Sequence, residues 1–210
     1  MLDMPAAIAR QRREIAATLA GLNEEQWETQ SCCAEWSVLE VAAHLTYGWN
    51  FSLLTNSLNM LKTGGNLDKV SAGYIRQLKT KGGAAIAADM AANADHRFKP
   101  PGLGFDAPLN DLVLHRRDMF LPLGIEYEVD EELLALVLDK STARGMFGMV
   151  NSQGALKGLS FTATDMDWTH GDGPEVSGPG IVLSHAMWGR AESLPELTGD
   201  GVAILGSRLS

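Results

Sequence analysis

The chain lacks the features that mark several common functional classes. Its basic residues form no run longer than the pairs Arg12-Arg13 and Arg116-Arg117, and its formal net charge is −9. Proteins that bind nucleic acid neutralise phosphates with clustered lysine and arginine, so this charge pattern argues against such a partner. No stretch approaches the ~18 uninterrupted apolar residues of a membrane helix, and no signal-peptide pattern is visible. We therefore expect a cytoplasmic protein with no nucleic-acid or membrane partner.

Cysteine is also scarce. The two cysteines, Cys32 and Cys33, are adjacent. Neighbouring cysteines rarely form a disulfide because the bridge is strained, so we expect two thiols in a reducing compartment. Cys33 is the candidate nucleophile, but the sequence places no basic residue beside it that would activate the thiol. We expect its side chain to be packed rather than catalytic.

With 210 residues, 45% of them hydrophobic, the chain can bury a sizeable core. Helical spacing of apolar residues dominates its first two thirds. Ser37 and Glu40 form an S-x-x-E capping box, which predicts a helix start at Val38. The expected helices run over residues 3–21, 38–64, 68–95 with a break at Gly82-Gly83, 106–121 with Asp106 as its cap, and from 130 onward.

The composition changes near residue 150, where glycine becomes frequent. Residues 159–164 alternate as a strand does, and a short strand is expected around Val176. We predict a helix over 179–190 and a last strand over 201–205. The expected class is α+β, with a helical bundle over residues 1–148 and a small mixed domain over 149–210.

The run 106–118 carries the most informative arrangement. Read as a helix, it places Asp111, His115 and Asp118 at i, i+4 and i+7, on one face. Most positions between them are apolar, so the helix should be buried, and a buried carboxylate and imidazole need partners. A divalent metal suits both groups. We nominate His44, which lies among apolar residues of an earlier helix, as the third ligand.

Each of these residues also has a purely structural interpretation. An acid followed by a histidine four residues later often makes only a surface hydrogen bond, and an inward histidine such as His44 is commonly a satisfied core residue. Glu40 could orient His44, although the capping box explains it fully. Asp118 is a candidate catalytic residue, as a fourth ligand or a partner of His115, or else a solvated carboxylate.

Three protein ligands leave coordination positions open, which is typical of catalytic rather than structural zinc sites. Two histidines and one aspartate suit zinc, and they also suit nickel, iron(II) or manganese. Arg116 and Arg117 are candidates for binding the carboxylate of a cofactor or substrate. A structural alternative is that they complement the helix C-terminus.

Several segments, taken in order, resemble one known family. They are Cys33-Ala-Glu-Trp-Ser-Val-Leu-Glu-Val-Ala-Ala-His44, Asp111-x-x-x-His115-x-x-Asp118, Pro122-Leu-Gly124, residues 161–168, Gly171-Asp-Gly-Pro174, Gly189-Arg190 and residues 197–201. Together they resemble the mycothiol-dependent maleylpyruvate isomerase family, within the larger DinB-like metal-binding superfamily. The resemblance covers nearly the whole chain.

The resemblance implies a DinB-like four-helix bundle followed by a small sterol carrier-like domain. It implies that His44, Asp111 and His115 hold a divalent metal, usually zinc, with Asp111 standing where the family more often has glutamate. It further implies that the metal activates the thiol of mycothiol for attack on a small electrophilic or unsaturated substrate. Arg190 matches a Gly-Arg of the family and is a second candidate catalytic residue, facing a substrate carboxylate.

We therefore expect a thiol-dependent isomerase or transferase whose partners are a small-molecule substrate and mycothiol, as a monomer or homodimer. One alternative is a metal-dependent hydrolase, with water at the open position. A second alternative is a non-catalytic binding protein whose sterol carrier-like domain holds an apolar molecule.

Overall fold

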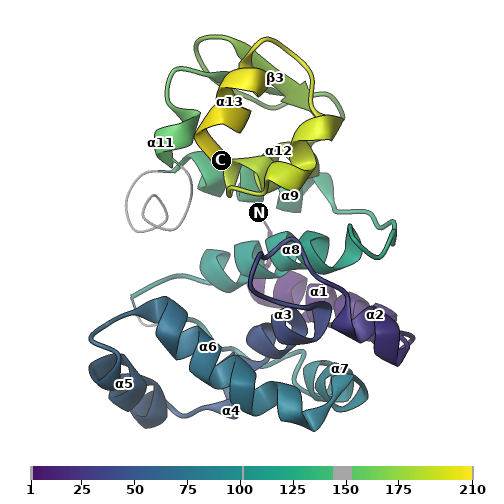
Figure 1. Cartoon of the computed structure of the whole chain (residues 1–210), viewed down its shortest axis with the longest axis vertical. Coiled ribbons are helices and arrows are strands. Elements are labelled where there is room, and N and C mark those ends of the chain that lie inside the picture. Colours follow the sequence, from purple (N-terminus) through teal and green to yellow (C-terminus); the bar gives the residue numbers. More distant parts are fainter. Residues whose placement is uncertain (1, 101, 144–152, 210) are drawn as a thin grey trace. The chain divides into compact units, whose positions relative to one another are not determined.

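The computed structural model describes residues 2–100, 102–143 and 153–209. Helices dominate it and one three-stranded sheet is present, which confirms the predicted α+β class (Figure 1). The chain separates into two compact units, Asp3–Glu126 and Tyr127–Ser210. The predicted boundary between residues 148 and 149 falls outside the described residues.

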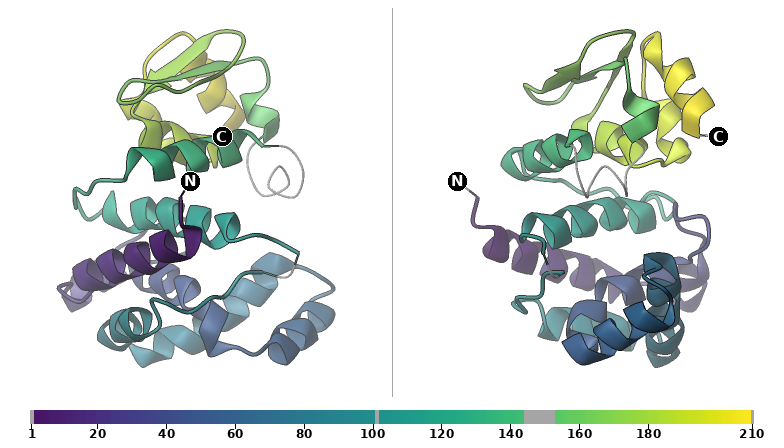
Figure 2. Two further views of the ribbon diagram at one scale, coloured as in Figure 1. Left: turned by 180° about the vertical axis from the view of Figure 1, so that it is seen from behind. Right: turned by 90° about the vertical axis from the view of Figure 1, so that its left-hand side faces the viewer.

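The first unit is helical, and its core forms where five helices meet. α1 packs against α7 and α8, while α3 packs against α6, α7 and α8. Figure 2 shows α1 running alongside α8. Fully buried apolar side chains such as Ile15, Val41, Ile86 and Val113 fill the space between these helices. The elements are α1 (Met4–Leu19), α2 (Glu24–Glu28), α3 (Val38–Leu45), α4 (Tyr47–Asn50), α5 (Leu53–Lys62), α6 (Leu67–Leu78), the 3-10 helix η1 (Lys79–Lys81), α7 (Gly83–Ala92) and α8 (Asp106–Phe120).

The long helix predicted over residues 38–64 is wrong, because the chain forms α3, α4 and α5 there. Thr46 ends α3, and its hydroxyl donates to Ala43 O at 2.8 Å. Phe51 is extended, with φ −129° and ψ 134°. Ser52 then caps α5 by accepting a hydrogen bond from Thr55 N at 3.1 Å. A second N-cap signal therefore interrupts what the apolar spacing alone reads as one helix.

The predicted break at Gly82-Gly83 is confirmed. Gly82 has φ +80°, a conformation that favours glycine, and it ends η1. Gly83 begins α7 against the ring of Trp27, which leaves no room for a Cβ atom. The glycine pair thus both turns the chain and admits a close contact.

α8 is buried along most of its length, including most of its polar residues, although Asp106 and Asp111 are partly exposed. Asp106 is its first residue rather than its cap, which corrects the prediction, because Phe105 occupies the N-cap position without a side-chain hydrogen bond. Pro108 lies in the first turn, as expected, where its missing N–H costs nothing. After Phe120 the chain turns at Gly124, with φ +65°.

The second unit combines a small sheet with helices. The strand order is β2-β1-β3, with β1 antiparallel to β2 and parallel to β3. Phe161 of β1 lies opposite His170 and Val176, and its side chain is buried with those of Val176 and Leu183. The elements are α9 (Glu131–Thr142), α11 (Gln153–Leu156), β1 (Ser160–Ala163), β2 (Thr169–Gly171), β3 (Glu175–Gly178), α12 (Gly180–Met187), the 3-10 helix η2 (Ala191–Glu196) and α13 (Gly201–Leu209).

Two features of this unit differ from the sequence predictions. Residues 201–205, predicted as a strand, begin the helix α13. Leu205 is fully buried, and Leu209, one turn later, packs on the same core, as the spacing of a helix requires. A segment of five residues is too short to reveal this spacing. α9, which the predicted boundary assigned to the first domain, packs against α12.

None of the helices in the described parts of the chain is both long enough and apolar enough to cross a membrane.

Candidate metal centre

α3 begins at the predicted capping box and carries His44 in its last turn. Ser37 Oγ accepts a hydrogen bond from Glu40 N at 3.4 Å, and Glu40 Oε2 accepts one from Ser37 N at 3.0 Å. The other oxygen of Glu40, Oε1, pairs with Lys79 Nζ at 2.8 Å. These contacts occupy both carboxylate oxygens of Glu40, so its position is explained without a role in orienting His44.

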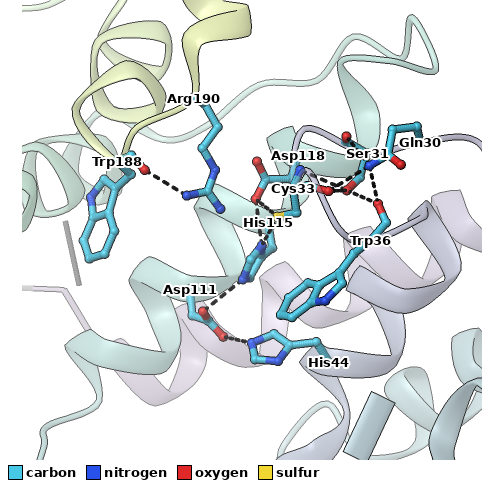
Figure 3. Close-up of polar contacts among 10 residues, drawn as sticks. All are labelled: Gln30, Ser31, Cys33, Trp36, His44, Asp111, His115, Asp118, Trp188 and Arg190. Atoms are coloured by element: carbon cyan, nitrogen blue, oxygen red, sulfur yellow. Dashed lines mark hydrogen bonds and ion pairs between the residues drawn. The ribbon is translucent and has the colours of Figure 1, made fainter. Parts of the chain in front are cut away.

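His44 and two residues of α8 converge on one point (Figure 3). His44 Nε2 lies 3.5 Å from Asp111 Oδ2, and His115 Nε2 lies 3.4 Å from Asp111 Oδ1. One ligand atom from each of the three residues lies within 4.8 Å of the others. The structure therefore brings together the three residues that the sequence nominated as ligands.

The separations between these atoms suit a bound metal. Good N–H···O hydrogen bonds have donor–acceptor distances of about 2.7–3.2 Å, shorter than the observed 3.4 and 3.5 Å. Two ligand atoms bound at about 2.0–2.1 Å to a tetrahedral zinc ion are about 3.3 Å apart. The donor set and its spacing thus fit a divalent metal held by His44, Asp111 and His115.

The second nitrogen of His115 is held by Asp118. The two atoms, Nδ1 and Oδ2, are 2.7 Å apart, and Asp118 is completely buried. Because the carboxylate accepts, Nδ1 carries the hydrogen, and Nε2 of a neutral imidazole is left as an acceptor facing Asp111. Two acceptors that face each other need a proton or a metal ion between them.

The charges around His115 favour a cation at the same place. Burial alone would lower the pKa of His115, but Asp111 and Asp118 outweigh it and raise this pKa well above its usual range. Loss of solvent alone would raise the pKa of Asp111, but His115 and His44 outweigh it and hold this pKa well below its usual range. An ionised Asp111 between two imidazoles therefore attracts positive charge, whether a proton or a metal ion.

Cys33 lies beside this pair, which differs from the expectation that it is only packed. Its Sγ donates to Asp118 Oδ2 at 3.1 Å and lies 3.7 Å from His115 Nδ1. The backbone N–H of Cys32 also donates to Asp118 O at 3.0 Å. The residues around Cys33 in the sequence could not reveal this contact, because its partners stand 82 and 85 positions later.

Arg116 points away from the three candidate ligands. Its Nη1 donates to Glu14 Oε2 at 2.7 Å and to Gln11 Oε1 at 3.1 Å, both on α1. Successive residues of a helix are separated by about 100°, so a neighbour of His115 faces another side. Arg117 is also buried. The role of both arginines in anion binding stays a prediction, and Arg116 would have to leave Glu14 to fulfil it.

Arg190 lies in the second unit, between α12 and η2. Its Nη1 donates to the carbonyl oxygen of Trp188 at 2.9 Å (Figure 3). Its predicted catalytic role stays a prediction, as does that of Asp118.

Aromatic rings that were not predicted from the sequence border the two imidazoles. The ring centroid of Trp36 lies 5.2 Å from that of His44 and 6.2 Å from that of His115. Tyr47 stacks on His44 at 5.5 Å with an interplanar angle of 29°. The available signal was the position of Tyr47 three residues after His44, which places the two side chains on one face.

Comparisons with known proteins match the chain to one family model and to two crystal structures of one fold. The family model described as "Mycothiol maleylpyruvate isomerase N-terminal domain" matches residues 8–120. A crystal structure of the mycothiol-dependent maleylpyruvate isomerase is similar, with a TM-score of 0.63 and 16% identity over 95% of this chain and 93% of that one. A histidine-to-alanine mutant of the isomerase gives a TM-score of 0.63 at 15% identity over the same shares of the two chains. At this identity the likeness shows a shared fold. No curated protein matches the chain.

Proposed function

Because the chain belongs to the family of the mycothiol maleylpyruvate isomerase N-terminal domain, we propose that it is a metal-dependent enzyme that uses a low-molecular-weight thiol to isomerise or conjugate a small electrophilic substrate. Mycothiol is the expected thiol, and zinc is the expected metal, with nickel, iron(II) and manganese as alternatives. The observation that carries the proposal is the convergence of His44, Asp111 and His115. The similar crystal structures, which are of a mycothiol-dependent isomerase, support the thiol.

The protein's contribution is to hold three ligands in a fixed arrangement with open coordination positions. When bound, the metal supplies Lewis acidity, which lowers the pKa of a thiol that coordinates it. Asp118 keeps the proton of His115 at Nδ1, which leaves Nε2 free to act as a ligand. Asp118 thus acts through His115, as a positioning residue. No cysteine of the chain is needed as nucleophile, because the thiol comes from the co-substrate.

The direct test is whether turnover needs an added thiol. Protein loaded with zinc would be incubated with a panel of unsaturated carbonyl compounds, maleylpyruvate among them, in the presence of mycothiol, of S-methylated mycothiol or of neither. We expect a compound of the panel to be turned over only where free mycothiol is present. Equal turnover without thiol would contradict the proposal and favour the hydrolase. Metal binding with no turnover under any condition would favour the binding protein.

Replacing Asp118 by asparagine should weaken zinc binding about 10- to 100-fold, which is the usual effect of losing an outer partner of a ligating histidine. Asparagine has a similar shape but no charge, so it no longer increases the basicity of His115. Competition with a chromophoric chelator would measure the dissociation constant.

The matched control for this prediction is Cys33→Ser. A serine hydroxyl can donate to Asp118 as the thiol does, so zinc affinity should stay near that of the parent. If Asp118→Asn also binds zinc as tightly as the parent, Asp118 does not position His115.

A further inference from the structure

Aromatic rings form a continuous series of contacts that begins at His44. We call the set Trp36, Tyr47, Phe51, Tyr74 and Phe98 the aromatic wall. We infer that the aromatic wall binds the body of the electrophilic substrate, and that this substrate is an aromatic or planar conjugated molecule rather than a small dicarboxylate. The inference rests on the proposed function, because it names the substrate class of the same site.

Trp36 is the part of the aromatic wall nearest to both candidate histidine ligands. Its indole lies beside the imidazoles of His44 and His115 (Figure 3). The loop before α3 fixes its position, because the Trp36 carbonyl accepts three hydrogen bonds. They come from Ser31 Oγ at 2.7 Å, Gln30 Nε2 at 2.9 Å and Ser31 N at 3.1 Å. The backbone that carries the ring is therefore fixed beside the metal centre before any substrate arrives.

Trp36 differs from the tryptophans of this unit that serve the fold. Trp27 is only 7% exposed, whereas Trp36 is partly exposed. The indole N–H of Trp49 donates to Asp89 at 3.1 Å, but that of Trp36 has no acceptor among the residues that the structure describes. A partly exposed ring with an unused donor can stack on a substrate and donate one hydrogen bond to it.

The other rings of the aromatic wall contact Tyr47 or one another. Tyr47 lies 5.2 Å from Phe98, edge to face, and 6.1 Å from Tyr74, stacked, while Phe51 stacks on Tyr74 at 4.0 Å. The ring of Phe98 packs directly against Gly48, and a Cβ atom at this position would clash with it. Tyr47, Phe51 and Phe98 are each partly exposed, so a ligand can reach part of these residues.

The polar groups of the site support the same substrate class. A dicarboxylate is best bound by charged donors such as arginine, and Arg116, the arginine next to His115 in the chain, pairs with Glu14 instead. The imidazoles of His44 and His115 are instead bordered by aromatic rings, which suit a planar apolar molecule.

Binding of unreactive substrate analogues tests the inference without requiring turnover. Calorimetry with zinc-loaded protein would compare 4-phenylbutan-2-one with pentan-2-one, which carries a methyl group in place of the phenyl ring. We expect the phenyl compound to bind about tenfold more tightly or better. Trp36→Leu should remove most of this preference and Trp36→Phe should keep part of it, while both variants retain the metal and the melting temperature of the parent.

The outcomes separate the inference from the proposed function. Equal binding of the two ketones by the parent, or an unchanged preference in Trp36→Leu, would overturn the inference even if the protein turned over maleylpyruvate with mycothiol. A phenyl preference that depends on Trp36 would support the inference even if no thiol-dependent turnover were found, which would contradict the proposed function alone.

Discussion

Replacing His115 by alanine should reduce the zinc content of the purified protein from about one ion per chain to nearly none. The variant keeps His44 and Asp111, but two ligands hold zinc far more weakly than three. The loss should exceed the roughly 10- to 100-fold effect of removing an outer partner of a ligand. Elemental analysis of protein prepared without a metal-binding tag would measure the change.

The matched control for His115→Ala is His96→Ala. His96 lies in the same unit, but its side chain is exposed, so its removal should leave the zinc content unchanged. Because His115 is buried beside Asp118, its loss could also impair folding. His44→Ala, which changes a more exposed ligand, provides a second test. The account would be contradicted if both ligand variants folded and kept one zinc per chain.

Zinc should stabilise the first unit, and more strongly as the pH rises. A ligand at a thousand times its dissociation constant adds about 4 kcal/mol to the free energy of unfolding. In the metal-free protein the raised pKa of His115 stabilises the fold. That contribution is complete below the pKa of an unfolded histidine, about 6.5, and is lost as the pH rises through the folded-state value.

Zinc takes the place of the proton on His115, so its stabilising effect should grow over the same rise in pH. Urea unfolding with zinc or with a chelator, at about pH 6 and about pH 8, would measure both free energies. His115→Ala should show little effect of zinc at either pH. An effect of zinc that is equal at the two pH values in the parent would contradict the proposed competition between the metal and a proton.

The sequence predicted the family resemblance and the α+β class, and both are confirmed. It also nominated three residues that the structure brings together. The parts of these predictions that concern α3 and α8 depend on local rules. Asp111 and His115 share a helical face through their spacing alone, and the Ser37 capping box fixes the start of the helix that carries His44.

The errors arose where local rules compete or where contacts are distant. Apolar spacing continues from α3 into α5, but the cap at Ser52 overrides it. Residues 201–205 are apolar and too few to distinguish a strand from the first turns of α13. The contacts of Cys33 with Asp118 and of Arg116 with Glu14 depend on tertiary packing, which no spacing in the sequence encodes.

The most direct test of the central claim is whether a thiol binds the metal held by His44, Asp111 and His115. Cobalt(II) can replace zinc in such sites and reports a bound thiolate through a charge-transfer absorption band. The Cys33→Ser protein, loaded with cobalt(II), would be titrated with mycothiol and with S-methylated mycothiol. The account predicts that the band appears with mycothiol alone and saturates at one thiol per metal. Bound cobalt that shows no such band at saturating mycothiol would contradict it.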